Sequence, residues 1–181
     1  GFTARMPVDE HRLFLSRLPS ASVEAYDYCL RGRQEFYLFQ RTGFERAVRL
    51  FRRAVDLDPG YAVAYAWLAN CYSFLYTWFE PSREILEAAE RDSLKAIELD
   101  PRLGEGHVAR GLVLSNQKEY EKAVIYADKC FFLFGTKAKE MQATLNELAP
   151  KEKAFDYWAL NDVATCLFIK AKALRGMDKD N

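Results

Sequence analysis

Two Asp-Pro dipeptides, Asp58-Pro59 and Asp100-Pro101, constrain most strongly what this chain can fold into. Proline cannot continue a helix interior, and it disfavours helical backbone at the residue before it. Each dipeptide therefore predicts that one helix ends and another begins. Alanine recurs 12 and 5 positions before each proline, at Ala47, Ala54, Ala89 and Ala96. Alanines at this spacing share a helix face, where small side chains let a neighbouring helix approach closely.

The same spacing of small residues occurs a third time, around Gly135, which lies 34 residues after Pro101. Ala123 and Cys130 hold the two small positions there. An apolar-rich stretch follows each Asp-Pro step, over residues 61–72 and 106–114, and predicts the first helix of the next unit. We therefore expect three helix pairs, over residues 22–59, 60–101 and 102–135.

Capping signals predict where several helices begin and end. Residues 42–45, Thr-Gly-Phe-Glu, match a capping box that would open the second helix of the first unit. Ser82 would open the second helix of the next unit. Residues 1–21 are expected to form an N-terminal extension with a short helix. Residues 136–181 are expected to be divergent C-terminal helices: one from a Thr136 cap to Leu148, a break at Pro150, and one from Lys151 to about Arg175 with Gly176 as its stop.

The repeated unit resembles the tetratricopeptide repeat. Ala69 and Gly111 match its small central position, and Tyr72 and Phe51 match two of its aromatic positions. Residues 25–33 are similar to the first repeat of arrays attached to bacterial signalling proteins, such as adenylate cyclases and kinases. The resemblance implies an all-α fold, an α-α superhelix of antiparallel helix pairs, with residues 136–181 as an incomplete fourth repeat. The sequence departs from the family pattern at His107, which occupies a position where tryptophan is usual.

Composition excludes several function classes. Lys plus Arg equals Asp plus Glu at 26 each, which argues against a broad basic surface for nucleic acid. No apolar run is long enough to span a membrane. Cys29, Cys71, Cys130 and Cys166 form no CxxC pair and stand in apolar helical contexts. We expect four small buried thiols, no metal site, a reducing compartment and a cytoplasmic location.

No catalytic motif is present. The sequence has no glycine-rich phosphate loop, no HExxH and no GxSxG. His107 has no evident nucleophile beside it and is expected to be a packing residue. We therefore expect neither enzymatic activity nor a cofactor.

The resemblance implies that the first helix of each pair lines a concave groove for an extended or helical peptide. Asn70 and Asn116 are the strongest candidates, because an amide can both donate to and accept from a peptide backbone. The apolar members could instead only pack against neighbouring helices. Relatives that bind chaperone C-termini clamp two carboxylates with cations. Asn70 and Arg33 could join such a clamp. Val108 and Leu112 stand where a cation is needed, so a largely apolar peptide or a helix is favoured. The groove residues are Tyr26, Arg33, Phe36, Tyr37, Asn70, Ser73, Phe74, Glu105, Leu112 and Asn116.

Two regions leave alternatives open. The aromatic residues 73–80 either extend a helix and pack, or form an exposed docking patch. The last helix carries Trp158, Leu167 and Phe168, which do not form the polar cap that a terminal repeat needs. Either the protein is longer or a second copy buries this helix. The expected function is a protein-interaction scaffold, and the alternative is a self-association or regulatory segment of a larger signalling enzyme.

Overall fold

The computed structural model describes residues 22–145 and 158–179, and every regular element in these two ranges is a helix. The expected N-terminal helix, the break at Pro150 and the residues from Lys151 to Tyr157 lie outside the described residues. None of the described helices is long and apolar enough to cross a membrane. In chain order the helices are α2 (Val23–Phe36), α3 (Arg41–Leu57), α4 (Ala62–Trp78), α5 (Arg83–Leu99), α6 (Gly104–Asn116), α7 (Tyr120–Ala143) and α8 (Trp158–Lys179).

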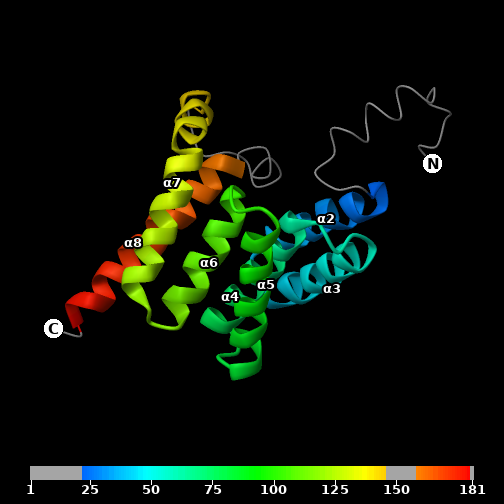
Figure 1. The fold of residues 1–181 in the computed structure, drawn as a ribbon, viewed down its shortest axis with the longest axis horizontal. Coiled ribbons are helices and arrows are strands. Elements are labelled where there is room, and N and C mark those ends of the chain that lie inside the picture. The colour runs from blue at the N-terminus through cyan, green and yellow to red at the C-terminus, as the bar shows by residue number, and fades with distance from the viewer. Residues whose placement is uncertain (1–21, 146–157, 180–181) are drawn as a thin grey trace.

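The helices pack in consecutive pairs (Figure 1). Helix α2 packs on α3, α4 on α5 and α6 on α7, and α8 then packs on both α6 and α7. The first helices of the pairs also neighbour one another, because α4 contacts α2 and α6, and α6 contacts α8. The fold is an all-α superhelix of tetratricopeptide type, as the sequence predicts.

Both Asp-Pro steps form the same turn. Asp58 ends α3 and Asp100 ends α5, and each aspartate carboxylate accepts the backbone N–H two residues ahead. The acceptor distances are 3.0 Å from Gly60 N to Asp58 Oδ1 and 2.9 Å from Arg102 N to Asp100 Oδ1. Such side-chain turns hold the backbone in a fixed reversal before the next helix. The predicted helix ends at both dipeptides are confirmed.

Capping differs between the two predicted second helices. Ser82 caps α5, and its hydroxyl oxygen accepts from Ile85 N at 3.3 Å, as predicted. The prediction that Thr42 opens α3 in a capping box is wrong. Helix α3 already begins at Arg41, and Gln40 holds the cap position without a side-chain hydrogen bond.

Two predicted boundaries near the C-terminus are also wrong. Thr136 caps no helix, because it lies inside α7, which runs unbroken from Tyr120 to Ala143. Gly176 does not stop α8, which continues to Lys179. The glycine has a packing reason instead: a Cβ at Gly176 would overlap the ring of Tyr120 at the start of α7.

The small residues that define the repeat lie where helices approach most closely. A Cβ at Gly32 would lie only 2.7 Å from Cε1 of Phe51, so this glycine lets α3 lie against α2. At Gly111 the close neighbour is Ile169 of α8. The remaining small positions are almost entirely buried: Ala47, Ala54, Ala89, Ala96, Ala123 and Cys130.

The aromatic residues 73–80 are partly packed against a helix and partly exposed, so each of the two alternatives holds for part of this segment. It extends α4 to Trp78, and Phe74 is buried with its ring stacked on that of Phe44 at 5.7 Å between centroids. Trp78 and Phe79, at its end, are 51% and 39% exposed. The insertion therefore packs over the start of α3 and leaves only its tip open.

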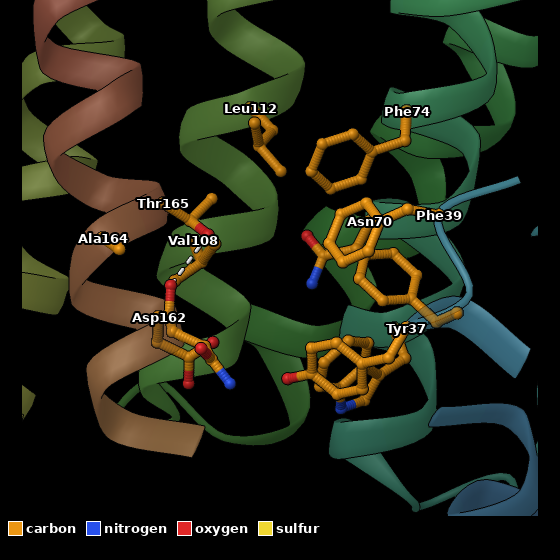
Figure 2. Close-up of a pocket in the computed structure, with 12 residues that line it drawn as sticks. Tyr37, Phe39, Asn70, Phe74, Val108, Leu112, Asp162, Ala164 and Thr165 are labelled. Carbon is orange, nitrogen blue, oxygen red and sulfur yellow. Dashed lines mark hydrogen bonds between the residues drawn. The ribbon is translucent and has the colours of Figure 1, made fainter. Parts of the chain in front are cut away.

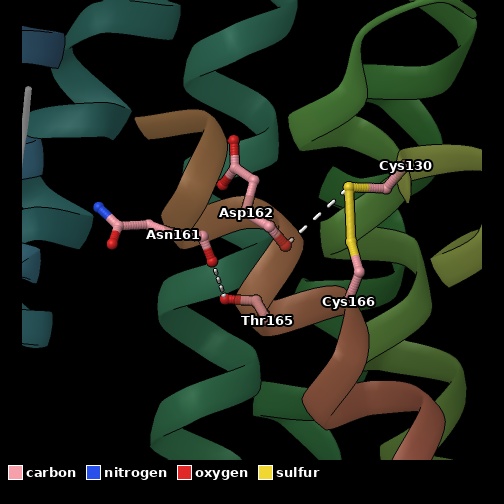
Figure 3. The surroundings of a disulfide bond; sticks show 5 residues. All are labelled: Cys130, Asn161, Asp162, Thr165 and Cys166. Atoms are coloured by element: carbon pink, nitrogen blue, oxygen red, sulfur yellow. Dashed lines mark hydrogen bonds between the residues drawn. A yellow bond between two sulfur atoms is a disulfide. The ribbon is translucent and has the colours of Figure 1, made fainter. Parts of the chain in front are cut away.

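Two of the four cysteines are paired. Cys130 of α7 and Cys166 of α8 form a disulfide that joins the last two helices (Figure 3). Cys29 and Cys71 are buried free thiols, as expected. The expectation of four thiols is therefore wrong, and the cysteines no longer argue for a reducing compartment. The pair was not apparent because its residues lie 36 positions apart on different helices.

Candidate functional site

A cavity of about 260 Å³ opens between the first helices α2, α4, α6 and α8 (Figure 2). Helices α2 and α4 supply one wall, and α6 and α8 supply the other. The position of the cavity follows from the packing of the helix pairs, because the first helices of successive pairs contact one another. The residues that line it are aromatic on one side and mixed polar and aliphatic on the other.

Aromatic rings form the wall nearest α2. Phe36, Phe39 and Phe74 all line the cavity, with centroids 5.4 Å apart for Phe36 and Phe74 and 6.2 Å for Phe39 and Phe74. Phe39, in the turn after α2, has a positive φ of 51°, which costs a residue with a side chain about 1–2 kcal/mol. The ring contacts with its neighbours hold this turn in place and keep the Phe39 ring at the cavity.

Asn70 supplies an unused hydrogen-bond acceptor. Its side chain projects from α4 into the cavity, and the residue is only 4% exposed (Figure 2). The Oδ1 atom has no hydrogen-bond partner among the described residues. A buried acceptor without a donor costs about 1–3 kcal/mol. A ligand N–H at this position would recover that cost.

Asp162 stands on α8, on the other side of the cavity from Asn70 (Figure 2). It is 6% exposed, and burial raises the pKa of its carboxyl well above the ordinary value. The nearby carboxyl of Glu105 raises this pKa further, while the guanidinium of Arg33 opposes the shift. The wall formed by α8 thus carries a buried carboxyl whose charge Arg33 offsets only in part.

Tyr37 faces the opposite wall of the cavity. Its hydroxyl points toward α8 (Figure 2), where Asn161 and Asp162 line the cavity. Burial is the main cause of the raised pKa of Tyr37, and the charge of Asp162 adds to it. On α8, Thr165 Oγ1 donates to the Asn161 carbonyl at 2.9 Å. The end of α2 and the start of α8 therefore face each other across the cavity.

A second hollow, of about 330 Å³, adjoins this polar wall. Arg33 and Glu105 line it together with Phe134. The Arg33 guanidinium lies 5.0 Å from the centroid of Trp67, a cation–π distance. Burial raises the pKa of Glu105, and Arg33 partly offsets that rise. One guanidinium thus serves both Glu105 and Asp162.

The structure separates the ten predicted groove residues into three sets. Phe36, Tyr37, Asn70, Phe74 and Leu112 line the cavity. Arg33 and Glu105 line the adjoining hollow. Tyr26, Ser73 and Asn116 line neither of them. Their binding roles remain predictions.

Asn116 has a structural position instead. Its Nδ2 donates to the Ser73 carbonyl at 3.1 Å, and its Oδ1 accepts from Thr77 and from Lys172, each at 3.0 Å. The amide therefore joins α4, α6 and α8.

The residues contributed by α8 were missed in the sequence. Asn161, Asp162 and Thr165 all line the cavity. A signal for them exists, because the predicted groove residues Arg33, Asn70 and Leu112 each directly follow a small central residue. Thr165 follows Ala164 in the same way. Carrying the repeat register into the last helix would have placed Thr165, and Asn161 one turn before it, at the groove.

The described residues hold no group of three or more His, Cys, Asp or Glu side chains that could bind a metal ion. His107 packs as a repeat-position residue, with its Nε2 atom 2.9 Å from the Pro101 carbonyl oxygen. Burial lowers its pKa.

No family model matches the chain. It is similar to part of a protein named as adenylate cyclase 3 in Rhizobium meliloti (strain 1021), at 30% identity over 102 residues, or 55% of this chain and 17% of that protein. It is also similar to Hsp70-Hsp90 organizing protein 1 of Glycine max, at 32% identity over 87 residues, and to Hsp70-Hsp90 organizing protein of Triticum aestivum, at 31% over 87 residues. Each of the latter matches covers 48% of this chain and 14% of the relative. The chain thus spans less than a fifth of the length of these relatives, and its similarity is to segments of larger proteins.

Proposed function

We propose that this chain is a protein-interaction module that anchors a side chain of a partner peptide in the cavity between α2, α4, α6 and α8, without catalytic chemistry of its own. The observation that carries the proposal is Asn70, whose buried Oδ1 faces the cavity without a hydrogen-bond donor. The aromatic rings beside it offer the apolar contact that peptide side chains bury on binding.

The size of the cavity favours an extended peptide over a docked helix. A helix with its side chains is about 10–12 Å across. A cavity of about 260 Å³ accommodates one large side chain and not a whole helix. The partner backbone would then run across the mouth of the cavity.

The relatives support the general role more than any particular ligand. Two of them are named as organizers of Hsp70 and Hsp90, which is a protein-binding role for those proteins. A C-terminal dicarboxylate is a poor candidate here, because it would meet the Asp162 carboxyl and the apolar side chains of Val108 and Leu112.

A second candidate function is that of a regulatory or self-associating segment of a larger signalling enzyme. The similarity to part of a protein named as an adenylate cyclase favours it. So does an apolar stripe on α8, where Leu167, Phe168 and Leu174 are 53%, 48% and 49% exposed. Light scattering over a range of concentrations would show dimers if this face self-associates, and Leu167→Glu should then restore monomers.

A displayed library of extended peptides tests the leading proposal. Peptides selected on the wild type should bind Asn70→Leu at least about tenfold more weakly, since leucine keeps the volume and removes the acceptor. Gln34→Ala, an exposed change on α2, is the matched control and should bind like the wild type. Circular dichroism would confirm that both variants are folded. Failure to select any peptide, or equal binding by Asn70→Leu, would contradict the proposal.

A further inference from the structure

The charge at the cavity has one sign. Among the described lining residues, Asp162 is the single charged side chain. Tyr37, Asn70, Asn161 and Thr165 also line it, and their oxygen atoms can all accept hydrogen bonds. The indole N–H of Trp67, which has no partner among the described residues, is a buried donor at the same cavity. A ligand that enters the cavity therefore meets one carboxyl and more acceptor oxygens than unpartnered donors, and a ligand rich in donors matches it best.

Among the described residues, Arg33 is the cation that offsets the charge of Asp162. Asp162 is buried and Glu105 is half-buried, and both carboxyls interact with this one guanidinium. The nearest cations on α8 are Lys170 and Lys172, which lie eight and ten residues further along, about 12 and 15 Å at 1.5 Å per residue. Lys170 already donates to Asp128, and Lys172 to Asn116. A buried charge without full compensation is costly, so a second cation at the cavity would be stabilised.

The positions of the acceptors indicate the shape of that cation. Asn70 lies on α4 and Asp162 on α8, on opposite walls (Figure 2). A guanidinium has five N–H donors that point in several directions in one plane, so it can reach both walls at once. It also stacks on aromatic faces, and Phe39 and Phe74 supply such rings beside Asn70. An ammonium is compact and more strongly hydrated, so it would satisfy one wall at a higher desolvation cost.

We propose that the cavity receives the guanidinium of an arginine side chain from a partner protein, held between the Asp162 carboxylate and Asn70 Oδ1 against the aromatic wall. This inference rests on the proposed function and names the side chain that the module selects. On binding, the cation keeps Asp162 ionised, so ligand and carboxylate stabilise each other.

The test uses NMR titration of the isotope-labelled chain with blocked pentapeptides of glycine that carry one central residue. The central residue is arginine, lysine or citrulline, the last being a neutral isostere of arginine. We expect the arginine peptide to bind at least about tenfold more tightly than the citrulline peptide, and more tightly than the lysine peptide. Asp162→Asn should remove the preference for arginine over citrulline. Asp178→Asn, the same charge change at an exposed site on α8, should leave it intact.

Several results would overturn the inference. Equal binding of the arginine and citrulline peptides would show that the site does not recognise the positive charge. Equal binding of the arginine and lysine peptides would show that it does not select the planar guanidinium. If n-butylguanidinium binds as tightly as the arginine peptide, the occupant is a small cation and not a protein side chain. Peptides with neutral central residues that bind the wild type and lose affinity with Asn70→Leu would refute the arginine assignment while leaving the proposed function in place. If no peptide in either experiment binds, both fail.

Discussion

Asn70 of α4 and Asp162 of α8 face the same cavity from opposite walls, and each is more than nine-tenths buried. Their positions in the chain are far apart, and only the docking of α8 against α6 and α7 brings them together. Polar groups of this kind are costly in a folded chain unless a partner satisfies them. This cost makes the cavity a better candidate for binding than the exposed apolar surfaces elsewhere on the molecule.

Asp162 should make the stability of the chain fall as the pH rises. Burial raises its pKa in the folded state well above the unfolded value of about 3.9, so the folded state holds a proton that the unfolded state has released. The free energy of unfolding should be highest below about pH 4 as far as this group is concerned. It should decline until the pH passes the folded pKa.

Urea unfolding at several pH values measures this effect in wild type and Asp162→Asn. The variant cannot ionise at this position, so its stability should gain on the wild type as the pH rises, and the two pH profiles should diverge. Parallel profiles would show that Asp162 is paired well enough to titrate normally.

Gly32 should tolerate no side chain. A methyl group there would lie 2.7 Å from Cε1 of Phe51, and that ring is fully buried and stacked on Trp67 at 6.1 Å between centroids. Overpacking costs about 1–3 kcal/mol, while alanine in a helix gains about 1 kcal/mol over glycine. We expect Gly32→Ala to lower the free energy of unfolding by about 1–2 kcal/mol.

Gly135→Ala is the matched control, because it is also a buried glycine within a helix. The nearest atom to its added Cβ is Cε1 of Phe131 at 3.4 Å, which is an ordinary contact. This variant should gain up to about 1 kcal/mol. Chemical denaturation of the two variants in parallel gives both values, and a stabilised Gly32→Ala would mean that Phe51 can move aside.

Cys29 should resist alkylation in the folded chain. Burial raises the pKa of its thiol to about 11, and the residue is 1% exposed. At pH 8 only about one thiol in a thousand would be the reactive thiolate. Iodoacetamide should therefore label Cys29 only after denaturant is added, as mass spectrometry of the digested protein would show. Rapid labelling under native conditions would place Cys29 at an open groove.

The disulfide should stabilise the last helix pair. Closing a loop between residues 36 positions apart removes chain entropy from the unfolded state, worth about 4 kcal/mol in the simplest treatment. Reductant should thus lower the free energy of unfolding by about 2–4 kcal/mol. Cys130→Ala/Cys166→Ala should be less stable and insensitive to reductant, whereas Cys29→Ala/Cys71→Ala should respond as the wild type does. A wild type unaffected by reductant would contradict the prediction.

The sequence predicted the fold best where proline and aspartate act together. A proline leaves the backbone few choices, so the ends of α3 at Asp58 and α5 at Asp100 were correctly placed. Glycine and threonine are weaker signals, because each is also tolerated inside a helix when packing requires it. Gly176, beneath the ring of Tyr120, shows how tertiary packing overrides a local stop signal.

The sequence predicted site residues on α2, α4 and α6 but missed those on α8. The positions of Asn70 and Leu112 follow from the repeat register alone, and the cavity contains both. The contribution of α8 was missed because the repeat register was not carried into the incomplete fourth repeat, where Ala164 holds the small central position. The internal bonds of Asn116 could not be foreseen, since they depend on Lys172 arriving from another helix.

The position of Tyr37, at the end of α2, and of Asn161, on α8, at one cavity has a mechanical consequence. The curvature of a helical-repeat array follows from small rotations between neighbouring units, so the array can bend or extend when these rotations change. Here the first and last of the described first helices line the same cavity, so an occupant of the cavity can contact both ends of the array. Stretching the array would move these helices apart and widen the cavity, so an occupant that bridges the two walls would stiffen the whole array against tension.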